Sequence, residues 1–336
     1  MRAAAETRAV MAPWFEALSD MSNVAELPEG VFAPDAILRL GYPFEAARGI
    51  GAFWLAAYDP LKAALSGLER QETIRIAGLD GDGALWVGSC GQYLGHWSAH
   101  WLGIPPSHGT ASMRFHEFYR VENGVCVEMQ ALWDIPEMMM QAGVWPMVPQ
   151  LGRFHHAPSP MTQDGLGPHD AGMSEGSCAH VVAMLAAMGR HPLQGGPEVM
   201  EMERFWHPRF MWYGPAGIGT ARGVEEFRRF HQIPFLAAMP DRGQHATRTR
   251  HHFIAEGAYV GVTGWPNMCQ TLSGGGWLGL PALGHLVTLR SLDFWRIENG
   301  LIRENWVLVD LLDLYDQIGI DVFARMKELA WSRGRA

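Results

Sequence analysis

The stretch that decides the fold is FYRVENGVCVE at residues 118–128, which recurs as FWRIENGLIRE at residues 294–304. Each copy places an Asn-Gly pair between two runs of apolar and β-branched residues, the strongest short signal for a β-hairpin. Displacing the sequence on itself by 176 residues aligns 118–143 with 294–319 without a gap, and 10 of the 26 pairs are identical. Unrelated sequences give about two identities over such a length. The chain is therefore predicted to be a tandem duplication.

The repeat also predicts the domain organisation. Upstream of the hairpin the displacement becomes 174, which aligns Ala47-Arg-Gly49 with Ala221-Arg-Gly223, so the copies differ by a two-residue insertion. A period near 175 residues is far too long for a solenoid and indicates two copies of one domain. We expect these at residues 1–147 and 176–336, joined by a linker at 148–175 that is rich in proline and glycine.

Within each copy, the hydrophobic patterns predict helices first and strands afterwards. In the first copy the expected helices are Ala3–Leu18, Ile50–Leu65 and one ending at Gln141, and the expected strands are Glu72–Leu79, Ala84–His96, Thr110–Val121 and Val125–Trp133. In the second copy the expected helices are Cys178–Met188, Val199–Phe205, Val224–Ala238 and Leu311–Ile318, and the expected strands are Ala246–Ala255, Ala258–Thr271, His285–Ile297 and Leu301–Val309. This order predicts an α+β fold of two cone-shaped barrels, each a curved antiparallel sheet with helices packed on one face.

Composition excludes several classes of partner. The chain has 336 residues with 26 basic and 35 acidic side chains, and its net charge of −9 disfavours nucleic acid as a partner. No uncharged apolar run is long enough to cross a membrane, and the charged first twenty residues do not resemble a signal peptide, so we expect a cytoplasmic protein. The cysteines are widely spaced and no zinc-binding pattern occurs, so we expect reduced thiols and no metal: Cys90, Cys126, Cys178 and Cys269.

Several motifs carry a resemblance to a known family. GIPPSH at 103–108, RVENG at 120–124 and QAG at 141–143 resemble the SnoaL-like polyketide cyclases of the nuclear-transport-factor-two-like superfamily, and GLP at 279–281 with RIENG at 296–300 repeats the pattern. The resemblance implies cones with deep apolar pockets and acid–base chemistry on an aromatic or polyketide-like small molecule, without metal or organic cofactor. It also implies that the two copies pack as a pseudo-dimer within one chain, with further homo-oligomers left open. Because the superfamily also includes isomerases, dehydratases, lyases and binding modules, the resemblance does not fix the reaction.

The sequence departs from the family at its catalytic positions. The aspartate that the cyclases carry seven residues after the turn glycine is replaced by Ala131 and Val307. Their histidine, three residues before the turn arginine, is replaced by Glu117 and Asp293, so each copy retains a carboxylate there. A carboxylate in an apolar, aromatic pocket has a raised pKa, which suits a general acid or base. Glu117 and Asp293 are therefore candidate catalytic residues.

Strand register decides whether these carboxylates face the pocket. A strict two-residue Asn-Gly turn pairs Asp293 with Trp306, whereas a bulged turn pairs it with Val307, and one slip exchanges the two faces. The family resemblance favours the bulged register, and a solvated carboxylate is the alternative. His116 adjoins Glu117 on a strand, so the two side chains point to opposite faces. His116 is a catalytic candidate with the alternative of an ordinary sheet histidine.

Two further aspartates lie at the junction between a predicted strand and the helix that follows it. The spacings Asp134 to Glu137 and Asp310 to Asp313 resemble capping boxes, so helix capping is the simpler account. The alternative is that Asp310, and by analogy Asp134, also faces the pocket as a general base.

Aromatic side chains on the strands are candidates for substrate binding. In the second copy we expect Trp212, Trp265 and Trp306 to line the cone and Tyr213 to supply a hydroxyl. In the first copy, comparable walls are expected to hold Trp54, Tyr58, Trp86 and Tyr93.

Two functions remain open from the sequence. The first is a cofactor-independent lyase, cyclase or isomerase that moves a proton with a buried carboxylate. The second is a non-catalytic binding or scaffold protein of the same fold. We expect the second copy to hold the working site, because it combines Asp293 and Asp310 with Trp306, whereas the first has Gln130 in place of the tryptophan.

Overall fold

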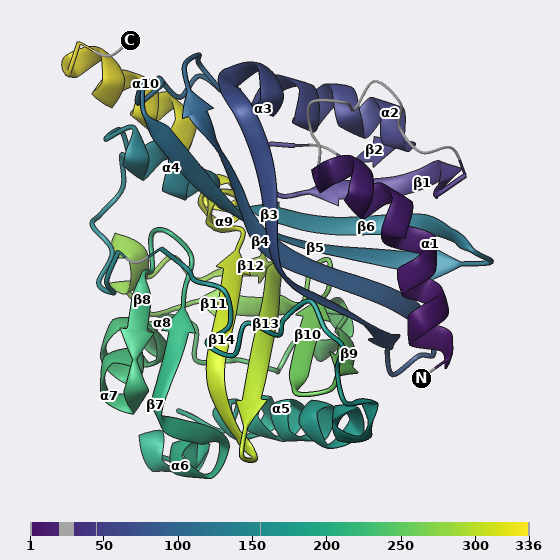
Figure 1. Ribbon diagram of the computed structural model, residues 1–336. Coiled ribbons are helices and arrows are strands. Elements are labelled where there is room, and N and C mark those ends of the chain that lie inside the picture. The colour runs from purple at the N-terminus through teal and green to yellow at the C-terminus, as the bar shows by residue number, and fades with distance from the viewer. Residues whose placement is uncertain (1, 20–29, 45, 155, 335–336) are drawn as a thin grey trace.

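A computed structural model describes residues 2–19, 30–44, 46–154 and 156–334. It contains two six-stranded sheets of the same topology, whose arrangement is drawn in Figure 1. The strand order is β2-β1-β6-β5-β4-β3 in one sheet and β8-β7-β14-β13-β10-β9 in the other, so equivalent strands occupy equivalent places. The predicted duplication into two α+β units is therefore confirmed.

The first unit comprises the elements up to α4. Its strands are β1 Phe32–Leu40, β2 Ala47–Arg48, β3 Leu65–Leu79, β4 Leu85–Trp97, β5 Thr110–Glu122 and β6 Val125–Trp133. Its helices are α1 Arg2–Ser19, α2 Ile50–Phe53, α3 Asp59–Ala64 and α4 Ile135–Gln141, with a π-helical turn η1 at Trp54–Tyr58. Helix α1 crosses one face of the sheet (Figure 1).

The second unit comprises the elements from α5 onward. Its strands are β7 Trp206–Tyr213, β8 Thr220–Arg222, β9 His252–Glu256, β10 Tyr259–Thr263, β11 Met268–Leu272, β12 His285–Leu289, β13 Ser291–Glu298 and β14 Leu301–Val309. Its α-helices are α5 Ser174–Met188, α6 Met202–Phe205, α7 Gly223–Phe227, α8 Ile233–Ala238, α9 Leu311–Gln317 and α10 Val322–Ser332. A π-helical turn, η4, spans Arg228–Gln232, and 3-10 turns lie at η2 Ala171–Met173, η3 Pro197–Met200, η5 Ala246–Arg248 and η6 Trp277–Gly279.

Each sheet contains a strand that the sequence pattern did not predict. β1 pairs in parallel with β6, and β7 pairs in parallel with β14, so the sheets are mixed rather than wholly antiparallel. Pro34 and Asp35 interrupt the alternation of β1, and Pro208 interrupts that of β7, which hides both strands from local pattern reading. The predicted strand Ala246–Ala255 was wrong in its first half, because η5 occupies Ala246–Arg248 and β9 begins only at His252.

The long β4–β5 hairpin of the first unit is interrupted at the equivalent place in the second unit. β4 and β5 pair continuously in the first unit, whereas β10 and β11 are separated, and a small sheet of β11 and β12 stands apart. The separation falls at Trp265-Pro266, where the proline has no N–H to donate to a neighbouring strand. Asn267 and Met268, which follow the break, border a cavity described below.

The two units pack sheet against sheet, with β5 in contact with β13 and β6 in contact with β14. Phe118 stacks on its repeat equivalent Phe294 with ring centroids 5.0 Å apart. Apolar side chains from both sheets form one buried cluster around this pair, including Ile74, Ile76, Trp86, Leu292, Trp306 and Leu308.

The segment after α4 runs along both sheets. Trp306 Nε1 donates to the Pro158 carbonyl oxygen at 2.9 Å, and the Arg75 backbone N–H donates to the Gly165 carbonyl oxygen at 2.8 Å. Residues 156–170 are therefore an ordered strap with contacts in both units. Among the helices in the described ranges, none combines the length and apolar character needed to cross a membrane.

Candidate active site

The second unit contains two adjoining cavities between its helices and its sheet. The inner cavity has a volume of about 70 Å³ and the outer cavity about 490 Å³. Leu185, Arg242 and Met268 line both, so the cavities meet at these three side chains. The inner cavity is lined mainly by apolar and aromatic groups, including Trp206, Trp212, Phe227, Phe235, Trp277 and Trp295.

Asp293 is the carboxylate in the wall of the inner cavity. β13 and β14 are in the bulged register, with Asp293 opposite Val307 and a shift between Arg296 and Ile297, which confirms the expected register. Alternation along β13 then turns Asp293 toward the cavity and Phe294 toward the first unit. Ser291 Oγ donates a hydrogen bond of 2.6 Å to Asp293 Oδ1. Burial raises the pKa of Asp293 to about 7, against the opposing effects of the Ser291 hydrogen bond and the Arg242 charge. This carboxyl is thus poised to exchange a proton near neutral pH.

His231 lies in the same wall and was not among the residues expected from the sequence. Its ring stacks on Trp212 with centroids 4.3 Å apart and planes at 13°. Burial, together with the Arg242 charge, lowers the His231 pKa to about 3, so the imidazole is neutral at pH 7. Its Nδ1 is buried without a hydrogen-bond partner. The spacing of Phe227, His231 and Phe235, four residues apart on one helical face, is the sequence signal that could have identified it.

Arg242 is the second residue that sequence reasoning missed. It follows α8 in the loop before η5, and burial lowers its pKa while the Asp293 charge opposes that effect. Within the described ranges, its guanidinium has no hydrogen bond or ion pair. No helical or strand periodicity marks a loop residue, so only the folded structure brings this cation to the cavity.

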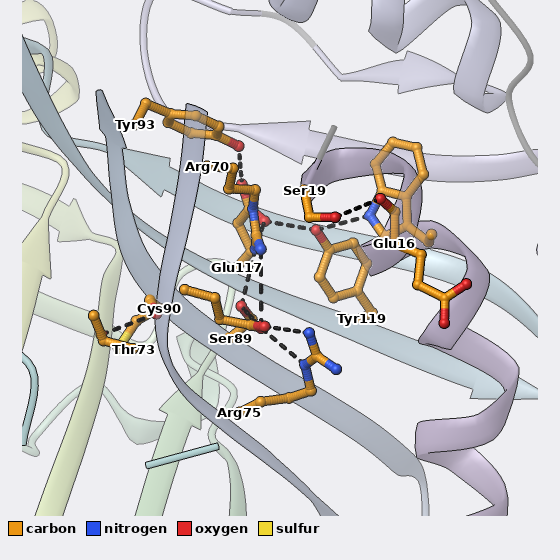
Figure 2. Close-up of polar contacts among 12 residues, drawn as sticks. Glu16, Ser19, Arg70, Thr73, Arg75, Ser89, Cys90, Tyr93, Glu117 and Tyr119 are labelled. Carbon is orange, nitrogen blue, oxygen red and sulfur yellow. Dashed lines mark hydrogen bonds and ion pairs between the residues drawn. The ribbon is translucent and has the colours of Figure 1, made fainter. Parts of the chain in front are cut away.

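The equivalent carboxylate of the first unit is fully enclosed by hydrogen-bond donors. Glu117 accepts hydrogen bonds from Tyr93 at 2.9 Å and Tyr119 at 2.6 Å, and it pairs with Arg70 at 2.8 Å (Figure 2). Trp133 Nε1 donates to the same carboxylate at 3.2 Å, and the Tyr58 hydroxyl lies 3.5 Å away.

The side chains around Glu117 explain the difference between the units. By the repeat, Phe115 and Trp133 stand where the second unit has Ser291 and Val309. Their rings, with Tyr93 between them, pack at centroid distances of 4.9 and 5.2 Å. Large rings therefore occupy space in the first unit that is cavity in the second.

The two candidate aspartates at the strand-to-helix junctions lie at the interface between the units. Asp310 Oδ2 accepts from the Tyr42 backbone N–H, and Asp134 Oδ2 accepts from the Ala216 N–H, both at 2.9 Å. Asp310 also caps α9 by accepting from the Asp313 N–H at 3.2 Å, whereas the Asp134 side chain makes no such cap. Burial raises the pKa of Asp310 to about 6, opposed by Arg290.

His116 also lies on the interface face of its sheet, opposite to Glu117. It donates from Nδ1 to the Leu292 carbonyl oxygen at 2.5 Å, and burial lowers its pKa to about 3. It has no contact with the cavities of the second unit.

The aromatic candidates divide between three environments. Trp212 lines the inner cavity. Trp306, Tyr213 and Trp86 belong to the cluster between the units, because alternation along their strands turns them away from the cone. Trp265 lies in the turn between β10 and β11 and packs against the same cluster. Trp54, Tyr58 and Tyr93 are buried inside the first unit.

One group of possible metal ligands occurs in the described part of the chain. The ligand atoms of Asp80, Asp82 and His252 lie within 4.8 Å of one another. The Asp80 carboxylate already accepts from His252 Nδ1 at 2.7 Å, from Trp86 Nε1 at 3.1 Å and from two backbone N–H groups. These donors assign Asp80 a hydrogen-bonding role at the interface between the units.

Residues 196–318 match the family described as SnoaL-like polyketide cyclase. The second unit is a SnoaL-like domain. Among solved structures, IdmH from Streptomyces antibioticus, a proposed polyketide cyclase, is 22% identical, covering 41% of this chain and 98% of its own, with a TM-score of 0.33. A proposed SnoaL-like polyketide cyclase from Jannaschia sp. CCS1 is 17% identical over 46% of this chain and 99% of its own, with a TM-score of 0.38. TsrD from Streptomyces laurentii is 23% identical over 42% and 96%, with a TM-score of 0.34. No curated protein matches the chain.

The SnoaL-like domain thus combines a small aromatic cavity with three titratable side chains of distinct character. Asp293 titrates near neutrality, His231 is neutral, and Arg242 is cationic. Such an arrangement can move a proton and stabilise negative charge on one bound molecule.

Proposed function

We propose that the inner cavity of the SnoaL-like domain is the active site of a lyase, cyclase or isomerase that moves a proton on an aromatic or polyketide-like small molecule. The observation that carries the proposal is Asp293, a carboxylate whose pKa is raised to about 7 by burial in an aromatic cavity. General bases and acids work best when their pKa lies near the operating pH.

The chemistry needs only the side chains of this domain. Ionised Asp293 accepts a proton from a carbon beside a carbonyl or from a hydroxyl, and the protonated carboxyl returns it to another atom of the same substrate. Negative charge that develops on the substrate oxygen lies in the electrostatic field of Arg242, and the neutral His231 ring in the same cavity wall offers that oxygen a hydrogen bond in the appropriate tautomer. Every step is a proton transfer between Asp293 and the substrate, so we expect, as the family resemblance implies, no metal or organic cofactor.

The dimensions of the site support a small-molecule substrate. The outer cavity, of about 490 Å³, lies within the range of roughly 300–1,000 Å³ typical of small-molecule sites. The filled interior around Glu117 supports one working site, in the second unit.

A binding protein without catalysis is the second candidate. It is favoured by Val307, an apolar residue at the position where the family resemblance places a catalytic aspartate. In that case Asp293 would bind a hydrogen-bond donor of the ligand without exchanging a proton with its carbon skeleton.

A turnover screen distinguishes the two functions. The whole chain, after exhaustive chelation and dialysis, is incubated with polyketide esters, aromatic diols and enolisable ketones, and products are followed by mass spectrometry and NMR. Conversion of at least one compound that survives chelation supports the enzyme. Binding of several compounds with conversion of none supports the binding protein, and a strict metal requirement contradicts the cofactor-independent mechanism.

A further inference from the structure

We propose that the ligand of the SnoaL-like domain carries a carboxylate, and that Arg242 binds this group where the inner and outer cavities meet. The inference rests on the proposed function for the location of the site, but not for any catalytic step. It names a substrate class, acids rather than neutral compounds.

The first observation is the position of the guanidinium. Arg242 lines both cavities, and within the described ranges it has neither a hydrogen bond nor an ion pair. A guanidinium has five N–H donors, and those of Arg242, a partly exposed residue, open onto the cavities and meet no protein acceptor in the described part of the chain. An anionic ligand supplies the missing acceptors, and a carboxylate matches the planar fork of an arginine with two parallel hydrogen bonds.

The second observation comes from the first unit. There the cation and the carboxylate form a closed pair, because Arg70 contacts Glu117 at 2.8 Å and both are buried. In the SnoaL-like domain Arg242 and Asp293 influence each other electrostatically but share no hydrogen bond or ion pair, and both border the inner cavity. The arginine and the carboxylate are therefore paired in the first unit and unpaired in the second. The unpaired Arg242 is available to a ligand.

The third observation is the charge of the surroundings. The titratable side chains that line the outer cavity are those of Arg242, His245, His251 and Cys269. No carboxylate is among the residues that line this cavity. His245 pairs with Asp241 at 3.0 Å, outside the lining. In the inner wall the titratable groups are Asp293, His231 and Arg242. Burial lowers the pKa of His251, so Arg242 is the permanent cation among the side chains that line the outer cavity, and no carboxylate in that lining competes for it.

The volumes place the parts of the ligand. The inner cavity, at about 70 Å³, accommodates only a small reacting group, whereas the outer cavity, at about 490 Å³, accommodates a ring system. A carboxylate at Arg242 would stand between them and orient the ligand, so that its reacting atom enters the inner cavity beside Asp293.

A matched pair of planar probes tests this inference without any need for turnover. The binding of 2-naphthoate and of the neutral isostere 2-naphthamide to the full chain is measured by isothermal titration calorimetry at pH 7.5. We expect the acid to bind about 10- to 100-fold more tightly, the usual difference made by charge-assisted hydrogen bonds. Arg242→Met should abolish this preference, and Arg242→Lys should restore part of it. Arg229→Met is the control, because Arg229 is exposed on the same domain and lines neither cavity.

The outcomes separate this inference from the proposed function. Equal affinity for acid and amide in the wild type, no binding of either at millimolar concentration, or an unchanged ratio in Arg242→Met would overturn the inference. The wild-type ratio decides even if a variant fails to fold. An acid preference in a protein that converts no substrate would leave the carboxylate site standing and refute the enzyme. Conversion of a substrate without an acid preference would support the enzyme and refute the carboxylate site.

Discussion

Replacing Ser291 by alanine should change the acidity of Asp293 without touching its carboxyl group. Ser291 Oγ donates to Asp293 Oδ1 at 2.6 Å, a short hydrogen bond that stabilises the ionised form. A hydrogen bond to a charged group contributes about 1.5–3 kcal/mol, and 1.36 kcal/mol corresponds to about one pKa unit. Because the bond favours the carboxylate, its loss in Ser291→Ala should raise the pKa of Asp293 by about 1 to 2 above its value of about 7.

Carbon-13 NMR of protein labelled at the aspartate carboxyl carbons measures this directly. The Asp293 signal is assigned by its absence in Asp293→Asn, and its shift is followed from pH 4 to pH 10. Ser332→Ala is the matched control, since Ser332 lies exposed at the end of α10 and donates only to the Leu329 carbonyl oxygen. A pKa near 4 in the wild type, or a pKa that stays constant or falls in Ser291→Ala, would refute the reasoning that burial and this hydrogen bond set the acidity.

Three further predictions concern stability and the division of labour. The pKa of Asp293 is about 7 in the folded protein and 3.8 in the unfolded chain, so ionisation of this carboxyl destabilises the fold. As pH rises from 5 to 8, the free energy of unfolding of the wild type, measured in urea, should therefore fall by about 2–3 kcal/mol relative to that of Asp293→Asn. The same difference between the two proteins at both pH values would contradict the raised pKa. Glu117→Gln should lower the free energy of unfolding by about 3 kcal/mol in the same assay, because it leaves the buried charge of Arg70 without its partner. Turnover per folded molecule should be unchanged, and a loss of turnover would reassign catalysis to the first unit. Asp310→Asn breaks the ion pair with Arg290 but leaves Arg290 paired with Asp313, and it retains an oxygen to accept from the Tyr42 N–H. We therefore expect it to lower the free energy of unfolding by no more than about 1 kcal/mol and to leave turnover within about twofold. Stable but inactive Asp310→Asn would show that Asp310 is catalytic.

The sequence was sufficient for features that depend on local chemistry or on the repeat. The Asn-Gly turns fixed both central hairpins, and the repeat implied two units with equivalent strands, which the strand orders confirm. The choice between two registers at Asp293 was also resolved correctly, because only the bulged turn matches the pattern of the resembling family.

Features that depend on tertiary partners were out of reach. β1 forms a strand because it pairs in parallel with β6. Pro34 and Asp35 weaken the intrinsic β-strand preference of this segment. Trp306 was expected in the cone, but the same alternation that brings Val307 to the cavity turns Trp306 into the interface between the units. Arg242 reaches the cavity from a loop, whose course no periodicity encodes.

The measurement that tests the central claim most directly is deuterium exchange at the carbon beside the carbonyl of a bound enolisable aromatic ketone, followed by NMR in D₂O. If the SnoaL-like domain transfers protons through Asp293, the wild type should accelerate exchange, and Asp293→Asn should reduce the acceleration by about 10²-fold or more, the usual contribution of a positioned general base. The acceleration should also rise about 50-fold between pH 5 and pH 7, because a carboxyl with a pKa of about 7 is about 1% ionised at the lower pH and half ionised at the higher. Equal acceleration by the wild type and Asp293→Asn would contradict the account.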